Sequence, residues 1–185
     1  MKTADVIIVG SGASGLFNAL FLPQDYKVIV ITKKEVEESD SFLAQGGISA
    51  LKNPEDYDSY FEDTMKAGHY ENDKGAVEKM IKESPQIIHD LKDFGVRFDL
   101  KDGEIEFTRE GGHSTFRILH HEDLTGKEIT SHLYEEAKKR DNITIMENCT
   151  MIDIIEKDGE CKGIVYKDAD GNLDTIEAPE TVLAT

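Results

Sequence analysis

A short glycine turn near the N-terminus sets how the first part of this chain can fold. Gly10, Gly12 and Gly15 follow the apolar run Val6–Val9 and precede the apolar stretch Leu16–Leu22. This order predicts a β-strand, a tight turn and an α-helix. The first glycine permits the turn, the second lets a phosphate group approach bare backbone, and the third lets the helix pack closely on the strand.

The first turn of a helix in this position offers unpaired backbone N–H groups, which suit phosphate oxygens. We therefore predict that the segment binds the pyrophosphate of a dinucleotide. A glycine-rich surface turn is the alternative, but the flanking strand and helix favour binding. The residues assigned to the pyrophosphate are Gly10, Ser11, Gly12, Ala13, Ser14 and Gly15.

A second β-rich run, Lys27–Thr32, predicts a strand parallel to the first and completes a β-α-β unit. In NAD-binding units an acidic residue at the end of this strand binds the adenosine ribose. Here Lys33 and Lys34 follow the strand, and Glu35 comes only after them. The usual NAD signal is therefore absent or displaced. Lys33 could bind ribose or phosphate oxygens, and solvated lysines at a strand end explain the pattern equally well.

Three helical segments are predicted in the middle of the chain. Asn53–Asp56 is typical of a helix start, and the apolar residues from Tyr57 to Met65 would pack into a core. A second helix is predicted over residues 73–94, and Pro85 should bend or break it. A third is predicted over residues 126–140.

The remainder of the chain is typical of β-structure. Ile143–Met146, Met151–Ile155 and Gly163–Tyr166 follow one another at short spacing with Asp-Gly turn signals, so we predict a small antiparallel meander. Thr181–Thr185 is a further apolar strand. A parallel strand needs a covering crossover, and none follows this one, so we expect the front part of a longer protein.

The charge of the chain argues against two classes of partner. With 38 acidic and 21 basic residues the net charge is -17, which disfavours nucleic acid and anionic membranes. No apolar stretch could span a bilayer, and cleavage of a signal peptide would destroy the first strand, so we expect a cytoplasmic protein. Cys149 and Cys161 have neither metal-ligand nor redox spacing, so we predict reduced cysteines and no metal site.

Two further glycine-containing segments carry groups suited to chemistry. Ser41–Ser49 combines small residues with a glutamine and suits backbone that passes close to a flat ring, although a plain turn would have the same composition. Thr108–Ser114, followed by Arg117 and His120, is the densest group of ionisable side chains beside flexible backbone in the chain. A polar surface loop is the alternative for this segment.

Taken together, these segments resemble the fumarate reductase and succinate dehydrogenase flavoprotein family, and within it the L-aspartate oxidase branch. The resemblance covers essentially the whole chain. The motifs that carry it are Gly10–Gly15, Thr32-Lys33, Ala44–Ile48, Thr108–Ser114 with Arg117, Ile118 and His120, Thr125-Gly126, and Val182–Thr185.

The resemblance implies an α/β fold. This is a Rossmann-like FAD-binding domain, incomplete here, with a parallel sheet, a small antiparallel β meander and a helical insertion. It implies a β-α-β unit at residues 1–52, a helical insertion with a substrate-side loop at 53–124, and a return to the FAD-binding domain with the meander at 125–185. The capping and C-terminal helical domains of the family, with its catalytic arginine base, would lie outside the chain, so the chain alone should be inactive.

The resemblance also implies FAD as the cofactor, with Lys33 near its adenosine end. The residues that would line the flavin are Asp40, Ser41, Phe42, Leu43, Ala44, Gln45, Gly46 and Gly47. Succinate dehydrogenase-type members carry a histidine that links covalently to the flavin, and Asp40 stands at that position. An aspartate cannot make that bond, so non-covalent FAD is implied, as in aspartate oxidases.

The implied reaction oxidises L-aspartate to iminoaspartate, with hydride transfer from Cα to flavin N5 and reoxidation by oxygen or fumarate. It is the first step of NAD biosynthesis through quinolinate, and a separate quinolinate synthase would take the unstable imine. The resemblance points to Glu110, His113 and Arg117 as catalytic-site residues. Glu110 would orient the substrate amine, because a carboxylate beside the substrate's own carboxylates is otherwise repulsive.

Other roles in this loop stay open. Arg109 and Arg117 could bind substrate carboxylates or pair with carboxylates of the protein, and we favour surface pairing for Arg109. His113, His120 and His121 are candidates for proton transfer, although a structural role is the commoner one for a histidine. Three alternative functions also remain: a soluble fumarate reductase or succinate dehydrogenase-type flavoprotein, a non-catalytic nucleotide-binding module, and an NAD-linked reductase.

Overall fold

The computed structural model describes residues 2–185. The chain divides into two compact units, one built from the residues up to Ala44 together with Ile129–Thr185, and the other from Gln45–Glu128. The second boundary falls inside helix α5 (Thr125–Lys138). In the described part of the chain no helix combines the length and the apolar character needed to cross a membrane.

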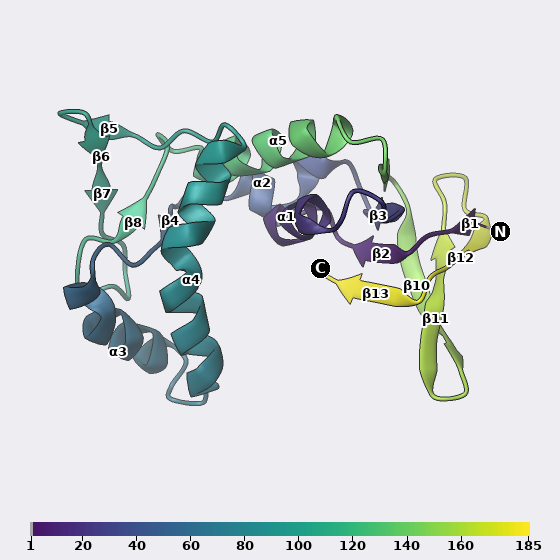
Figure 1. The fold of residues 1–185 in the computed structure, drawn as a ribbon, viewed down its shortest axis with the longest axis horizontal. Helices are drawn as coiled ribbons and strands as arrows, with labels where there is room; N and C mark the ends of the chain where they lie inside the picture. The colour runs from purple at the N-terminus through teal and green to yellow at the C-terminus, as the bar shows by residue number, and fades with distance from the viewer. Residues whose placement is uncertain (1) are drawn as a thin grey trace. The chain divides into compact units, whose positions relative to one another are not determined.

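A four-stranded parallel sheet with the order β13-β2-β3-β9 forms the centre of the first unit (Figure 1). Every residue of β2 and β3 is buried, as expected for parallel strands covered on both faces. Helix α1 connects these two strands and contacts both, which confirms the predicted β-α-β unit. The bounds are β2 (Val6–Val9), α1 (Ala13–Phe21), β3 (Val28–Ile31), β9 (Ile143–Met146) and β13 (Glu180–Leu183).

The placement of β9 in the meander was wrong. This strand pairs in parallel with β3, with Ile143 opposite Val28. β9 follows helix α5 directly, so it is the return strand of a helical crossover. The short segment between β9 and β10 (Thr150–Lys157) is therefore not a hairpin turn. β13 pairs in parallel with β2 on the other side of the sheet.

An antiparallel meander of β10 (Thr150–Lys157), β11 (Glu160–Lys167) and β12 (Leu173–Glu177) completes the first unit, and β1 (Lys2–Thr3) pairs in parallel with β12. The predicted meander is therefore confirmed, but it lacks the predicted first strand, β9, and gains β12 at its end. One core joins a face of the parallel sheet to the meander; its buried residues are Ile7, Val9, Ile29, Ile31, Cys149, Ile164, Tyr166, Ile176 and Ala178.

The second unit contains two helices and short strands. Helices α3 (Tyr57–Ala67) and α4 (Lys74–Asp93) pack together around Tyr60, Met65, Val77 and Ile81. The 3₁₀ helix η2 precedes α3, and Asn53 Oδ1 accepts a hydrogen bond from Asp56 N at 3.1 Å, as its helix-start signal predicts. The short elements are β4 (Ile48–Ser49), η2 (Pro54–Asp56), β5 (Leu100–Lys101), β6 (Glu104–Ile105), β7 (Phe107–Thr108) and β8 (Ile118–Leu119).

The sequence predicted that Pro85 would bend or break its helix. Pro85 does not break helix α4, which runs continuously from Lys74 to Asp93. A proline inside a helix leaves the carbonyl four residues earlier without its usual N–H donor. Here the Ser84 hydroxyl donates to the Ile81 carbonyl at 2.7 Å and also accepts from Leu51 N at 2.8 Å. The neighbouring serine therefore replaces the lost donor and ties the helix to the segment after β4.

Candidate functional site

A cleft of about 970 Å³ opens in the first unit at the carboxyl ends of the parallel strands. Its walls include Val9 at the end of β2, Ile31 at the end of β3 and Leu183 at the end of β13. This edge of an open α/β sheet is where such folds bind ligands.

The glycine turn packs so tightly at this edge that two of its residues admit no side chain. Gly10 has φ +114°, and a Cβ there would lie 2.2 Å from the carbonyl oxygen of Ala184. A Cβ on Gly15 would lie 2.0 Å from the carbonyl oxygen of Gly10. Glycine at these positions lets β13 and the first turn of α1 approach the strand end, as the fingerprint requires.

The start of helix α1 faces this cleft without a capping side chain. Gly12 is the N-cap residue and supplies no side-chain hydrogen bond, while Ser11, Gly12 and Ser14 line the cleft. The Ser11 hydroxyl is buried and has no hydrogen-bond partner within residues 2–185. A buried unpaired hydroxyl is costly, and a phosphate oxygen would satisfy it together with the open N–H groups of the helix. These residues therefore fit the pyrophosphate of FAD.

The segment after β3 forms another wall of the cleft. It carries the 3₁₀ helix η1 (Val36–Glu38) and the short helix α2 (Asp40–Leu43). Lys33, Asp40 and Ser41 line the cleft. Lys34 pairs with Glu38 at 2.8 Å, whereas Lys33 is exposed and pairs with no carboxylate in the described part of the chain.

Some residues assigned to the cofactor do not border this cleft. Ala13 and Gly15 belong to the turn and helix beneath it, and Phe42, Leu43 and Ala44 lie in or directly after α2. Gln45, Gly46 and Gly47 belong to the second unit. The assignment of residues 40–47 to the flavin therefore stays a prediction.

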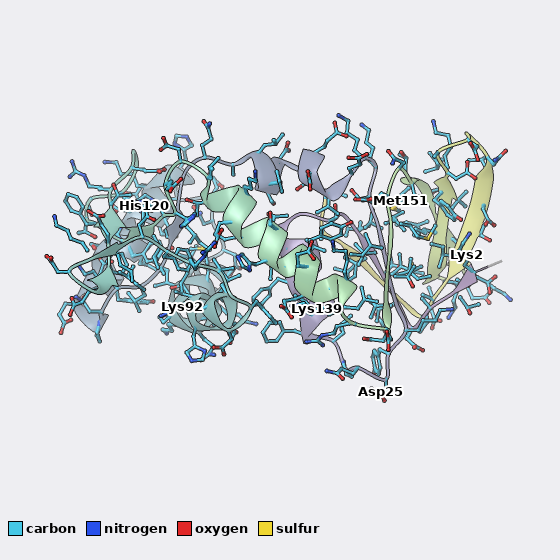
Figure 2. All side chains as sticks on the ribbon, turned by 90° about the horizontal axis from the view of Figure 1, so that it is seen from above. Lys2, Asp25, Lys92, His120, Lys139 and Met151 are labelled. Atoms are coloured by element: carbon cyan, nitrogen blue, oxygen red, sulfur yellow. The ribbon has the colours of Figure 1, made fainter. Side chains whose placement is uncertain are left out.

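The sequence interpretation missed several residues that line the cleft. Thr150 and Met151 follow β9, next to the buried Cys149, whose thiol pKa is raised by burial; Met151 is labelled in Figure 2. A parallel pairing of Ile143–Met146 would have predicted this position, because the residues after each parallel strand gather at the same edge. The other lining residues not assigned to the cofactor are Val9, Ile31, Thr32, Lys34, Glu35, Glu38, Ser39, Cys149, Leu183, Ala184 and Thr185.

In the second unit, Arg117 is the centre of a buried polar network. Its side chain is fully buried. Nε and Nη2 donate to Asp56 Oδ2 and Oδ1, both at 2.8 Å, in a bidentate fork, and Nη2 also donates to Ser59 Oγ at 2.7 Å. Nη1 donates to Asp63 Oδ2 at 2.6 Å and lies 3.0 Å from His113 Nδ1.

All five N–H donors of Arg117 are therefore engaged. Of the two alternatives that the sequence left open, the structure supports pairing with protein carboxylates, in a buried network. In this arrangement Arg117 has no donor left for a substrate carboxylate.

The two carboxylates of the network are held in their charged form. Hydrogen bonds from Arg117 lower the pKa of Asp56 to about 2. Burial alone would raise the pKa of Asp63, but hydrogen bonds from Ser114 and Arg117 outweigh it, so that pKa is lowered too. Burial raises the pKa of the neighbouring Tyr60, whose ring centroid lies 4.8 Å from the Arg117 guanidinium.

Glu110 and His113 stand at the two ends of one tight turn. His113 N donates to the Glu110 carbonyl at 3.2 Å, and Gly112 between them has φ +89°. The Glu110 carboxylate lies against bare backbone, because a Cβ on Gly46 would be 3.3 Å from both carboxylate oxygens. The second glycine segment and the Glu110 loop are therefore neighbours within this unit.

The other ionisable side chains in and after this loop contact different partners. His120 (labelled in Figure 2) and His121 contact Asp99, with Nδ1 atoms 3.1 and 3.4 Å from its two carboxylate oxygens. The preference for surface pairing of Arg109 was wrong for the described residues. Its guanidinium lies 5.7 Å from the Phe116 ring centroid, and it forms no ion pair within residues 2–185.

A cluster of metal-ligand type exists on helix α4, although the sequence predicted no metal site. His89, Asp90 and Asp93 bring one ligand atom each to within 4.8 Å of one another, and no other such group occurs in residues 2–185. His89 and Asp93 are exposed, and His89 Nδ1 contacts Asp93 Oδ2 at 3.2 Å. A contact between side chains one turn apart on an exposed helix surface explains this arrangement.

The chain belongs to the FAD binding domain family, whose model matches residues 5–185. This agrees with the cleft, the glycine turn and the unpaired Ser11 hydroxyl in the first unit.

Within that class, the chain is a homologue of L-aspartate oxidases. It is 42% identical over 184 residues to the L-aspartate oxidase of Clostridium perfringens, a match that covers 100% of this chain and 42% of the relative. It is 42% identical over 182 residues to the L-aspartate oxidase of Clostridium acetobutylicum, covering 98% of this chain and 42% of that protein. The chain therefore spans about two-fifths of the length of these relatives.

The fold also matches a solved flavoprotein of the family named from the sequence. A structure of the E. coli quinol fumarate reductase FrdA superimposes with a TM-score of 0.92 at 27% identity, covering 100% of this chain and 33% of that one. The predicted fold, an α/β FAD-binding domain with a parallel sheet and an antiparallel meander, is confirmed.

Proposed function

We propose that this chain is the FAD-binding portion of an enzyme that oxidises L-aspartate to iminoaspartate. The observation that carries the proposal is the match to L-aspartate oxidases over essentially all of its residues. The placement of Glu110, against Gly46 and at the end of an anchored turn, supports it. The product would supply quinolinate and NAD synthesis, and the electron acceptor would be oxygen or fumarate.

In this proposal the first unit holds the cofactor. Ser11, Gly12 and Ser14 bind the pyrophosphate with one hydroxyl and the backbone of the helix start, and Lys33 lies near the adenosine end. Asp40 provides no nitrogen that could attach to the flavin, so the cofactor is dissociable. When bound, FAD supplies the acceptor for the hydride that leaves the substrate Cα.

The second unit orients the amino group of the substrate. Glu110 offers a carboxylate to the ammonium, which offsets the repulsion that a carboxylate would otherwise exert on the substrate's own carboxylates. His113 stands at the other end of the same turn, and its Nε2–H can donate one hydrogen bond there, because Nδ1 accepts from Arg117. Arg117 acts on this site through His113 and the turn, since its own donors are engaged.

The full-length protein tests this function. Purified protein should carry flavin absorbance, release FAD on denaturation, and produce hydrogen peroxide or iminoaspartate from L-aspartate. A protein that holds FAD, reduces fumarate and does not oxidise L-aspartate would instead be a soluble fumarate reductase, the alternative that the FrdA similarity favours. A colourless protein that binds nicotinamide nucleotides would contradict both.

A further inference from the structure

The loop that carries Glu110 and His113 is anchored by two carboxylates, Asp63 on helix α3 and Asp56 at the end of η2, directly before α3. Asp63 Oδ2 accepts hydrogen bonds from Ser114 N at 2.7 Å, from Ser114 Oγ at 2.8 Å and from Arg117 Nη1 at 2.6 Å. Asp56 Oδ1 accepts from Thr115 Oγ1 at 2.7 Å in addition to its fork with Arg117. The carboxylates of Asp63 and Asp56 thus hold three residues that follow the turn, namely Ser114, Thr115 and Arg117.

The turn itself has few other supports. A Cβ atom added at Gly111 or Gly112 would have no neighbouring atom within 4 Å. Its hydrogen-bonded anchor is therefore at the Ser114 end, on Asp63, while at the other end the exposed Glu110 carboxylate lies beside the bare backbone of Gly46. Loss of the contact between Ser114 and Asp63 would free the turn, because glycine restricts backbone rotation less than any other residue.

The same network fixes how His113 can form hydrogen bonds. Arginine has N–H donors and no acceptor, so the 3.0 Å contact from Arg117 Nη1 requires His113 Nδ1 to accept. A neutral ring then carries its proton on Nε2, and this N–H is the donor left for a ligand. The position of Arg117 is set in turn by Asp63 and Asp56.

We propose that Asp63, supported by Asp56, is a positioning residue that holds Glu110 and His113 in the geometry needed to orient the substrate ammonium. It touches neither substrate nor cofactor and acts through Ser114 and Arg117. The inference rests on the proposed oxidation of L-aspartate and adds to it the residue that pre-organises the amine-recognising loop.

The test compares Asp63→Asn with Asp58→Asn in the full-length, FAD-loaded protein. Asp58 lies on the same helix but is exposed, so its variant controls for loss of one negative charge on α3. For Asp63→Asn we expect kcat/KM for L-aspartate to fall by about tenfold to a hundredfold, and fumarate reduction by less than about threefold, because fumarate has no amine to orient. Asp58→Asn should change neither reaction.

A double-mutant cycle with Glu110→Gln distinguishes positioning from general damage. If Asp63 acts through Glu110, Asp63→Asn should cost little further L-aspartate turnover once Glu110 is replaced. Losses that multiply independently, or equal losses on L-aspartate and fumarate, would overturn the proposal.

A milder variant covers the case in which Asp63→Asn does not fold or loses FAD. Ser114→Ala removes one hydroxyl donor and leaves the ion pairs of Arg117 in place. It should raise KM for L-aspartate and leave fumarate reduction unchanged, and an unchanged KM would overturn the proposal. Wild-type protein that does not oxidise L-aspartate would refute the proposed function itself, before any variant is measured.

Discussion

Replacement of Arg117 by lysine should destabilise the second unit far more than an ordinary charge-conserving substitution. The guanidinium makes five hydrogen bonds, four of them to Asp56, Asp63 and Ser59, and its side chain is fully buried. Lysine keeps the charge but has three donors on a single atom and cannot form the fork with Asp56.

At least two hydrogen bonds are therefore lost in Arg117→Lys. Hydrogen bonds that involve charged groups contribute about 1.5–3 kcal/mol each, so we expect a loss of roughly 3–6 kcal/mol in the free energy of unfolding. The lower end applies if the Lys ammonium retains Asp63, and the upper end if Asp56 is left buried without a partner. Removal of one partner from a buried ion pair typically costs about 3–5 kcal/mol, which agrees with this range.

Arg97→Lys is the matched control. Arg97 lies in the same unit, its side chain is 74% exposed, and it pairs with Glu128 at 3.3 Å. Because the guanidinium of this pair is largely in water, the pair contributes about 0–1 kcal/mol and lysine can replace arginine there, while Glu128, 11% exposed, keeps its hydrogen bond from Arg97 N.

Urea denaturation of the full-length protein gives the stability difference. Hydrogen–deuterium exchange of peptides from residues 45–128 then shows whether the change lies in the second unit. If Arg117→Lys costs no more than Arg97→Lys, the buried network does not stabilise this unit, and the argument from donor number fails.

Three further outcomes follow from the geometry. Because the pKa of Asp56 is lowered from 3.8 to about 2, its charge stabilises the fold by roughly 2 kcal/mol above pH 4, and acid titration should abolish the stability difference between wild type and Asp56→Asn as pH falls from about 4 to 2. Gly10→Ala should abolish FAD binding, since its Cβ would lie 2.2 Å from a backbone carbonyl oxygen, whereas Gly103→Ala, also at positive φ but with open space around it, should leave flavin content unchanged. Ser11→Ala should weaken FAD binding by about twofold to tenfold in a flavin titration, while Thr130→Val, which removes another unpartnered buried hydroxyl outside the cleft, should not.

The features that sequence could predict are those encoded by neighbouring residues. The glycine turn lies between the strand and helix that it joins, so Gly10 and Gly15 can be assigned from local spacing alone. The β-α-β unit, the meander and the helix start at Asn53 follow in the same way. Strand β9 was misplaced because parallel pairing joins Ile143 to Val28 across more than one hundred residues, and no local pattern records that partner.

The buried network was missed for a related reason. Asp56 and Arg117 are 61 residues apart, and Asp63 is 54 residues from Arg117. In a chain with 38 acidic residues, two more aspartates on a helix are typical of a solvated face. One signal was present: Asp56, Ser59 and Asp63 recur at helical spacing, which places three polar side chains on one face of the helix that also carries the buried Tyr60.

The charge balance of this network bears on which substrate the loop can recognise. Arg117 is opposed by Asp56 and Asp63, so the three groups together carry one negative charge, and Glu110 adds another to the same loop region. This net negative charge attracts an ammonium group and repels a carboxylate. Fumarate and succinate bring only carboxylates, whereas L-aspartate brings an amine as well, so under the proposed function this net charge would favour the group that distinguishes L-aspartate from the other two. The exposed Arg109, unpaired within residues 2–185, is the cation of this loop that is left to meet a carboxylate.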